Sequence, residues 1–283
     1  MTSLAIAQTA WRIREAHFPL QIAFTRPRKT AAVSLTGGSC ALNCAHCGRR
    51  YLRGMMPIWN ADVQDATSCL ISGGCDAEGR VPVLAYLEQV HALRTGRRLN
   101  WHVGLIGEDE IQAIAPYVDV VSFDLVGDDA TIHEVYGLPC GVGDYIRTYQ
   151  MLRRYVHAVP HITIGLRGGE ICGEYHALSL LQELGAEALV FIILIPTKGT
   201  AYEGREPPMV QEVGELLTAA RQALPDTPIY LGCMRPAGGY RDSVDRIAIR
   251  AGVNKIVNPA SSAVALAAEM GLRITWEEEC CVF

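Results

Sequence analysis

The chain has 283 residues, of which 49% are hydrophobic and 19% charged, and its formal net charge is -5. A nucleic-acid-binding surface needs a basic face, so this acidic balance argues against nucleic acid as a partner. The longest apolar run, residues 188–196, falls short of the roughly 20 residues that a membrane-spanning helix needs. The first residues lack the basic start of a signal peptide, so we expect no membrane association and a cytoplasmic protein.

Short β-branched or apolar runs alternate with longer amphipathic segments almost to the end of the chain. After an N-terminal helix over residues 4–16, eight strands are predicted over residues 31–35, 68–72, 99–105, 118–124, 161–166, 188–195, 228–231 and 255–258. The segments between them have helical periodicity, for example residues 83–95, 144–156, 174–184, 209–223 and 243–251. One more extended segment is predicted over residues 272–276.

This alternation predicts an α/β fold in which the strands close into a parallel (β/α)8 TIM-type barrel. An open doubly wound sheet is the alternative. No linker or low-complexity stretch interrupts the pattern, so residues 1–283 are expected to form one domain. We expect residues 1–30 to be the N-terminal helix and lead-in, residues 31–270 the barrel, and residues 271–283 a short cysteine-containing tail. In a barrel the functional loops follow the carboxyl ends of the strands.

Ten cysteines in a chain expected to be cytoplasmic indicate metal ligation or catalysis, because disulfides are disfavoured in a reducing compartment. Cys40, Cys44 and Cys47 follow the first predicted strand with the spacing C-x3-C-x2-C. Closely spaced cysteines let one loop wrap an iron–sulfur cluster, and three ligands leave one iron open. Zinc is the alternative, with His46 as a fourth ligand, but His46 lies between Cys44 and Cys47 and is poorly placed to complete a tetrahedron. The spacing therefore favours a [4Fe–4S] cluster.

The cysteine motif resembles that of the radical S-adenosylmethionine (SAM) superfamily. This resemblance implies a radical SAM barrel in which the open iron binds the amino and carboxylate groups of SAM. It also implies that an electron from the cluster cleaves SAM to a 5′-deoxyadenosyl radical, which abstracts hydrogen from the substrate. The electron donor would be a protein such as ferredoxin or flavodoxin. His46 stands where the family usually has an aromatic ring against the cluster and adenine, so we expect it beside SAM.

Motifs at four further strand ends resemble the SAM-binding segments of the same superfamily. After the second strand, Ser72-Gly73-Gly74 matches the glycine part of a turn whose backbone carbonyl contacts the SAM amino group. Asp124 ends the fourth strand, and its carboxylate is the candidate acceptor for the ribose hydroxyls. The two remaining motifs follow the fifth and sixth strands.

The segment after the fifth strand resembles the Gly-Ile-x-Gly-x-x-Glu segment of radical SAM proteins. It implies that Glu170 orients the loop and that Arg167 faces the SAM carboxylate. After the sixth strand, Pro196 and Thr197 begin a Pro-x-x-Gly-Thr turn. In biotin synthase, lipoyl synthase and their relatives this turn lies beside the adenine, so both residues are candidate SAM contacts.

Residues near the end of the chain indicate how the reaction could finish. Arg235 matches the arginine that binds an auxiliary [2Fe–2S] cluster in biotin synthase, although the matching auxiliary cysteines are absent. Cys280 and Cys281 lie in an acidic tail that could fold over the barrel mouth, where Cys75 and Cys233 are candidate co-ligands of a second iron–sulfur cluster. A sulfur-handling thiol is a further role for the tail, and a structural or partner-docking role is the alternative.

The whole pattern is most similar to the biotin/lipoyl synthase group, and within it to two-component lipoyl synthases. In those enzymes two radical SAM subunits insert sulfur into an octanoyl chain on a lipoyl-domain carrier protein. The resemblance therefore implies a sulfurtransferase of lipoate biosynthesis, with a second radical SAM subunit and the carrier protein as partners. One alternative is a single-cluster lyase or mutase of the methylornithine synthase or hydrogenase-maturation type. Another is a non-catalytic partner subunit that binds a cluster.

Overall fold

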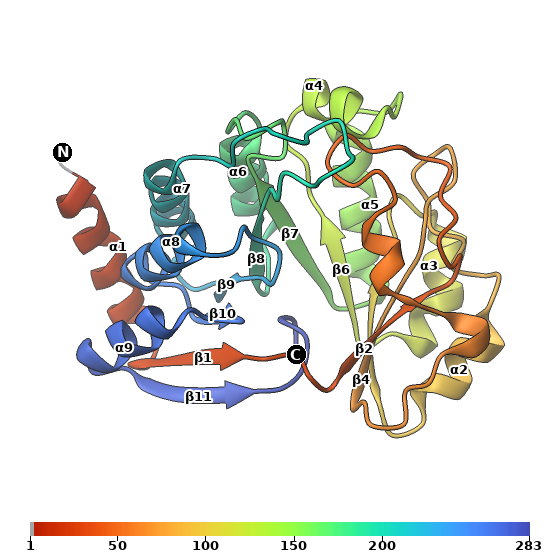
Figure 1. The fold of residues 1–283 in the computed structure, drawn as a ribbon, viewed down its shortest axis with the longest axis horizontal. Helices are drawn as coiled ribbons and strands as arrows, with labels where there is room; N and C mark the ends of the chain where they lie inside the picture. Colours follow the sequence, from red (N-terminus) through yellow and green to blue (C-terminus); the bar gives the residue numbers. More distant parts are fainter. Residues whose placement is uncertain (1–2) are drawn as a thin grey trace.

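A sheet of 11 parallel strands organises the computed structural model, which describes residues 3–283 (Figure 1). The strands are β1 (Gln21–Thr25), β2 (Thr30–Ser34), β3 (Met56–Pro57), β4 (Ser68–Ser72), β5 (Arg98–His102), β6 (Val120–Asp124), β7 (Ala158–Ile164), β8 (Leu189–Ile193), β9 (Ile229–Leu231), β10 (Lys255–Val257) and β11 (Arg273–Glu277). Across the sheet their order is β11-β1-β10-β9-β8-β7-β6-β5-β4-β2-β3.

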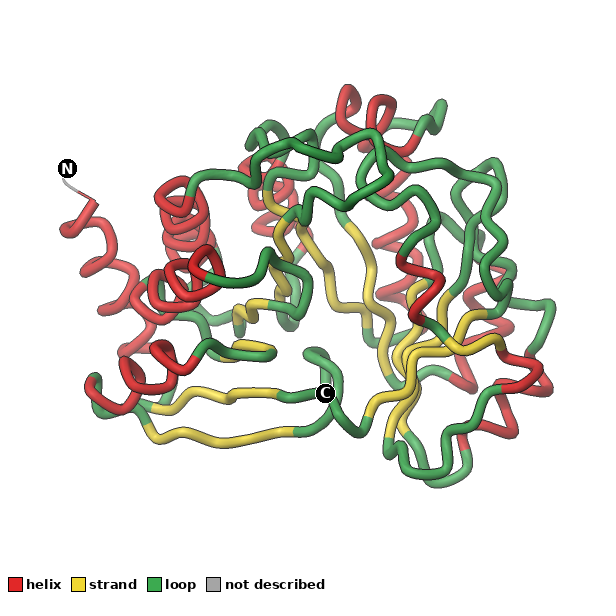
Figure 2. Tube along the Cα trace, viewed as in Figure 1, coloured by secondary structure: helices red, strands yellow, loops and turns green. Residues whose placement is uncertain are grey.

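Parallel neighbours need crossover connections, and most of these crossovers are helices on the outside of the curled sheet (Figure 2). The helices are α1 (Ser3–His17), α2 (Leu87–Arg94), α3 (Glu108–Ile114), α4 (Asp129–Thr131), α5 (Val142–Tyr155), α6 (Glu174–Leu184), α7 (Val210–Ala223), α8 (Gly239–Arg250) and α9 (Ser261–Glu269). None of the helices within residues 3–283 combines the length and apolarity that crossing a membrane requires.

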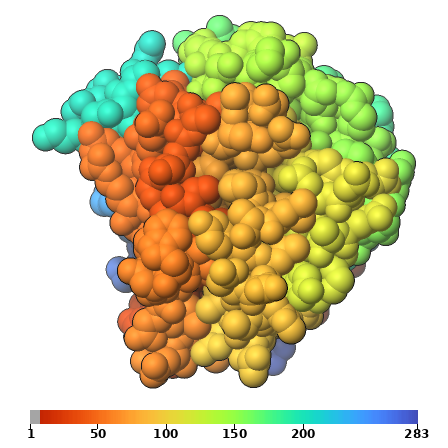
Figure 3. Space-filling view, turned by 90° about the vertical axis from the view of Figure 1, so that its right-hand side faces the viewer, coloured from red at the N-terminus to blue at the C-terminus, as the bar shows by residue number. Residues whose placement is uncertain are grey.

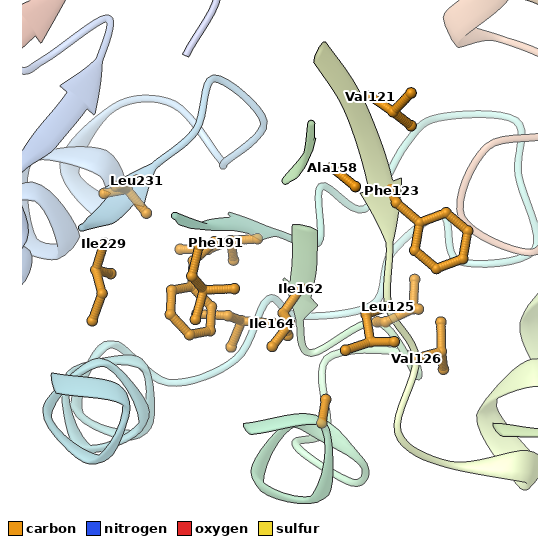
Figure 4. Close-up of a cluster of buried hydrophobic side chains, with 14 of the residues drawn as sticks. Val121, Phe123, Leu125, Val126, Ala158, Ile162, Ile164, Phe191, Ile229 and Leu231 are labelled. Atoms are coloured by element: carbon orange, nitrogen blue, oxygen red, sulfur yellow. The ribbon is translucent and has the colours of Figure 1, made fainter. Parts of the chain in front are cut away.

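Side chains alternate between the two faces of each strand and so build two separate cores. On the outer face, buried residues of β7, β8 and β9 pack toward the helices, namely Ile162, Ile164, Phe191, Ile229 and Leu231 (Figure 4). On the inner face, a smaller cluster fills the inside of the curl with Val120, Val159, Val190 and Val257. Each fully buried side chain of this size stabilises the fold by roughly 1.5–3 kcal/mol.

The structure confirms the predicted α/β architecture of parallel strands and helices, and all eight predicted strands are present within a few residues of their expected bounds. The expected closure is wrong, because among residues 3–283 the strand ladder keeps two free edges, at β11 and β3. The sheet is therefore a curled, open barrel. The predicted lead-in also contains β1, which pairs with β10 and β11, and these partners are far away in the sequence.

The C-terminal segment spans the opening of the barrel. The backbone N–H of Lys29 donates to the Glu278 carbonyl over 2.8 Å, and the Arg98 guanidinium pairs with Glu279. Residues 280–283 then turn inward, and Cys281 packs into the inner cluster. Figure 1 shows the C-terminus in the gap between β1 and β2. The tail was expected to fold over the barrel mouth, and instead it enters the interior.

A buried ion pair ties α8 to the strands. Arg235 donates to both carboxylate oxygens of Asp245 over 2.7 and 3.0 Å, and both side chains are fully buried. The same guanidinium donates to the Gly232 and Asn258 carbonyls, which follow β9 and β10. The Asp245 carboxylate also accepts the backbone N–H of Ala260. This network holds the helix on two strand ends at once.

We expect Arg235→Leu to lower the free energy of unfolding by about 3–5 kcal/mol, because it leaves the Asp245 carboxylate buried without a cation. Chemical denaturation followed by circular dichroism measures this loss. The control is Arg246→Leu, which removes an exposed guanidinium from the same helix and should change stability by no more than about 0.5 kcal/mol. Equal stability of the two variants would contradict a structural role of the buried pair.

Candidate functional site

A cavity of about 260 Å³, here called the mouth cavity, lies where β2, β4, β5 and β6 end. Its wall includes all three motif cysteines, Cys40, Cys44 and Cys47, and the cysteine that follows β4, Cys75. The cysteine loop also meets the loop after β8, where Tyr202 donates its backbone N–H to the Ala45 carbonyl over 3.1 Å. In the space-filling view the red-orange cysteine loop lies between the teal and light-orange parts of the chain (Figure 3).

The turn after β4 clamps the cysteine loop in place. The backbone N–H of Ala41 donates to the Cys75 carbonyl over 2.7 Å, and the N–H of Cys75 donates to Cys40 Sγ over 3.2 Å. The N–H of Gly74 donates to Thr36 Oγ1 over 2.6 Å. A hydrogen bond to a cysteine sulfur stabilises its thiolate form, the form that binds metal.

Glycine is required at position 74 because the two loops approach so closely. A Cβ there would lie 1.9 Å from the Ser39 carbonyl oxygen and 2.5 Å from the Cys40 Cβ. The expected SAM-binding turn of Ser72, Gly73 and Gly74 therefore lies directly against the cysteine loop, and all three residues line the mouth cavity.

The electrostatics of the cavity favour a positively charged occupant near the cysteines. Burial, followed by the neighbouring charges of Cys47 and Cys40, raises the pKa of Cys44 to about 12. Burial, followed by the neighbouring charges of Cys40 and Cys44, raises the pKa of Cys75 to about 12. Three thiolates at this position would repel one another, and an iron–sulfur cluster would supply the positive iron centres that stabilise them.

Two polar atoms in the cavity region are buried and have no partner: Nδ1 of His46 and Oδ1 of Asp124. Burial lowers the pKa of His46 to about 4, so its imidazole is neutral. Burial alone would raise the pKa of Asp124, but the nearby histidines, His102 first, outweigh it and lower that pKa. His102 Nε2 lies 3.6 Å from the free Asp124 oxygen. An ionised carboxylate with a free oxygen fits the expected contact with ribose hydroxyls.

Two of the expected SAM contacts lie away from the mouth cavity. Arg167 donates to Glu134 over 2.7 Å, and that carboxylate also accepts the Tyr202 hydroxyl. Together with Glu170, Arg167 lines a separate cavity of about 10 Å³. The structure therefore does not bring Arg167 or Glu170 to the cysteines.

The turn after β8 adjoins the mouth cavity through one tyrosine. Thr197 Oγ1 lies 3.2 Å from the Tyr51 hydroxyl, and Tyr51 lines the cavity, whereas Thr197 and Pro196 do not. Sequence reasoning did not assign Tyr51 or Tyr145, which also lines the cavity. Tyr51 follows Cys47 by four residues, a proximity that could have marked it. Tyr145 lies in α5, where helical periodicity marks it only as a core residue.

The candidate auxiliary-cluster residues do not form one group. Cys75 belongs to the mouth cavity, and Arg235 is engaged by Asp245 and two backbone carbonyls. Cys280 and Cys281 lie inside the barrel, and the two sulfur atoms are 3.8 Å apart. The expected set therefore divides, and Cys233, which follows β9, is exposed.

Comparison with known proteins agrees with this geometry. No protein-family model matches the chain. It is 26% identical to a biotin synthase from Pelodictyon phaeoclathratiforme, over 66% of this chain and 62% of that enzyme. The match thus spans less than two thirds of the length of that relative.

Three solved structures share the fold at 12% sequence identity each. Methylornithine synthase (PylB) has a TM-score of 0.67, with coverage of 96% of this chain and 89% of that chain. The hydrogenase maturase HydG from Carboxydothermus hydrogenoformans has a TM-score of 0.70, with coverage of 96% and 72%. The HMG-CoA lyase from Brucella melitensis has a TM-score of 0.54, with coverage of 92% and 93%. At this identity the likeness concerns the fold alone.

The chain thus combines a curled parallel barrel with a C-x3-C-x2-C loop at the carboxyl ends of its strands. The sequence likeness to a biotin synthase and the fold shared with methylornithine synthase and HydG support an assignment to the radical SAM superfamily, as a biotin synthase-like protein.

We expect Gly74→Ala to displace the cysteine loop, because the added Cβ has no room beside Ser39 and Cys40. The variant should lose most of its iron after anaerobic reconstitution and lose about 1–3 kcal/mol of stability. Iron analysis and denaturation measure the two effects. Gly38→Ala is the matched control in the same loop, since nothing lies within 4 Å of its added Cβ. Equal iron content in both variants would contradict the clamp.

Proposed function

We propose that the chain is a radical SAM enzyme that holds a [4Fe–4S] cluster at Cys40, Cys44 and Cys47. The observation that carries the proposal is the convergence on one cavity of these cysteines, the Gly73-Gly74 turn and the Asp124 carboxylate, whose Oδ1 is buried without a hydrogen bond. The three thiols are the ligand type that iron–sulfur clusters take, and three ligands leave one iron for SAM.

When bound, the cluster and SAM supply a 5′-deoxyadenosyl radical that removes hydrogen from the substrate. The protein binds and orients the groups. The Cys75 N–H donates to Cys40 Sγ and so favours its thiolate. In the same cavity Asp124 would accept hydrogen bonds from the ribose hydroxyls, and the turn at Gly73 and Gly74 would offer backbone to the SAM amino group. The neutral ring of His46 packs near Tyr136, with ring centroids 5.7 Å apart, and contributes an aromatic wall.

Sulfur insertion is the reaction we propose for this site, on an octanoyl chain carried by a lipoyl-domain protein. The likeness to biotin synthase supports it, and so does a pair of thiols inside the same barrel. The proposed partners are the carrier protein, a second radical SAM subunit, and a ferredoxin or flavodoxin as the electron donor.

A lyase or mutase with one cluster is the second candidate, and the fold likeness to methylornithine synthase over 96% of the chain supports it. A third candidate is a partner subunit that binds a cluster without turnover. The reaction products separate these functions, because sulfur insertion adds sulfur to the acyl chain and the other two functions do not.

Cys44→Ala should abolish formation of 5′-deoxyadenosine from SAM, because it removes one of the three cluster ligands. The assay uses anaerobically reconstituted protein with dithionite and chromatographic detection. Cys172→Ser is the control, since Cys172 is exposed and does not line the mouth cavity. Wild-type protein that retains its cluster but forms no 5′-deoxyadenosine would favour the non-catalytic partner subunit.

Incubation with an octanoylated lipoyl domain tests the substrate. We expect the carrier to gain mass as sulfur replaces hydrogen on the acyl chain when the second radical SAM subunit and reductant are present. Intact-protein mass spectrometry measures the gain, and the control reaction contains the Cys44→Ala variant. Formation of 5′-deoxyadenosine without added sulfur on the carrier would instead favour the lyase or mutase.

A further inference from the structure

The tail brings two thiols and an imidazole together inside the barrel, and this group is distinct from the residues of the mouth cavity. Cys280 Sγ lies 3.8 Å from Cys281 Sγ, and Cys281 Sγ lies 3.8 Å from Nε2 of His161 on β7. Cys281 and His161 are each only 6% exposed. We call Cys280, Cys281 and His161 the tail thiol site.

Hydrogen bonds around the tail thiol site orient the lone pairs of its ligand atoms for binding a cation. Nδ1 of His161 lies 3.1 Å from the Val159 carbonyl, which can only accept, so the proton resides on Nδ1 and the Nε2 lone pair faces Cys281. Metal-binding histidines characteristically donate their second ring N–H to such a carbonyl or carboxylate.

The hydrogen bonds around Cys280 likewise orient a donor toward its sulfur. The Ser122 hydroxyl donates to Asn100 Oδ1 over 2.9 Å, which directs the Asn100 amide N–H toward Cys280 Sγ, 3.4 Å away. A donor that faces the sulfur stabilises the thiolate, which is the metal-binding form of cysteine.

The two cysteines are unsuited to each other as a disulfide. Adjacent residues have Cα atoms about 3.8 Å apart, whereas disulfides usually need at least about 4.4 Å. A vicinal disulfide would therefore be strained, and the pair is better suited to bind one partner through both sulfurs.

We propose that the tail thiol site binds a thiophilic metal, iron or zinc, through Cys280, Cys281 and His161. A tetrahedral metal with bonds of about 2.3 Å to sulfur and about 2.0 Å to nitrogen has edges of about 3.8 Å between sulfurs and about 3.5 Å between sulfur and nitrogen. The observed sulfur–sulfur separation of 3.8 Å matches the first edge, and the observed sulfur–nitrogen separation of 3.8 Å is slightly longer than the second.

Cys233 is the fourth ligand we assign, because it follows β9, whose Tyr230 packs in the same inner cluster as Cys280 and Cys281. As they stand, no three His, Cys, Asp or Glu side chains within residues 3–283 are placed to hold one metal ion. Binding at the tail thiol site therefore requires a side-chain adjustment that draws the third and fourth ligands toward the two sulfurs.

The tail thiol site lies next to the proposed reaction cavity. The ring of His161 lies 6.1 Å from the ring of His102, and His102 lines the mouth cavity. A metal at this position would be a second centre beside the substrate. Metal binding itself does not depend on the proposed radical chemistry, so failure of one leaves the other intact.

The experiment uses the full-length chain with Cys40, Cys44 and Cys47 changed to Ala, prepared without oxygen. Titration with cobalt(II) should show one metal per chain and a thiolate-to-cobalt charge-transfer band. Adding Cys280→Ser and Cys281→Ser should remove both signals, whereas Cys172→Ser should leave them unchanged. His161→Ala and Asn100→Ala should each weaken binding by at least about tenfold. No cobalt binding, or binding that survives loss of Cys280 and Cys281, would overturn the proposal.

Two further measurements use protein without substitutions in the tail, so a folding defect of the variants cannot affect them. They also identify the kind of metal centre. Bound cobalt should protect Cys280 and Cys281 from alkylation in the parent protein, as read by mass spectrometry, and equal labelling with and without metal would overturn the proposal. Reconstitution with iron(II) and sulfide then distinguishes the two forms of the site. Iron with acid-labile sulfide identifies an iron–sulfur centre, iron without sulfide identifies a single ion, and either result supports metal binding.

Discussion

The parallel direction of all the strands is the constraint on which the rest of this structure depends. Because every neighbouring pair runs the same way, the carboxyl ends of β2, β4, β5 and β6 gather at one rim of the curled sheet. The cysteine loop, the glycine turn, His102 and Asp124 lie at these ends, although they are spread over more than 80 residues of sequence. The sheet therefore assembles the cavity without any single long insertion.

Close contact between two of these strand ends makes the cysteine loop rigid. Backbone hydrogen bonds join Ala41 and Cys75, and no side chain fits at position 74. A ligand loop held in this way keeps its thiols in place before any metal binds, which reduces the ordering cost of binding.

The open edge of the sheet has a second consequence. A closed ring of strands would fill its interior with its own inward side chains, whereas here the C-terminal residues enter through the opening. Lys255 donates to the Phe283 carbonyl and holds the end of the chain inside. The tail thus contributes two sulfur atoms to a region that the strands alone line mostly with valine.

Much of the fold and part of the site followed from local sequence. Period-two runs and helical periodicity predicted the strands and the main helices, since both patterns depend on near neighbours. The cysteine spacing and the Gly73-Gly74 turn predicted the cluster loop for the same reason. Only the tertiary structure decided that β1 joins the sheet and that the tail enters the barrel. It also decided that Arg235 pairs with Asp245 of α8 and that Arg167 pairs with Glu134. These outcomes depend on contacts between residues far apart in the chain, and no local pattern encodes them.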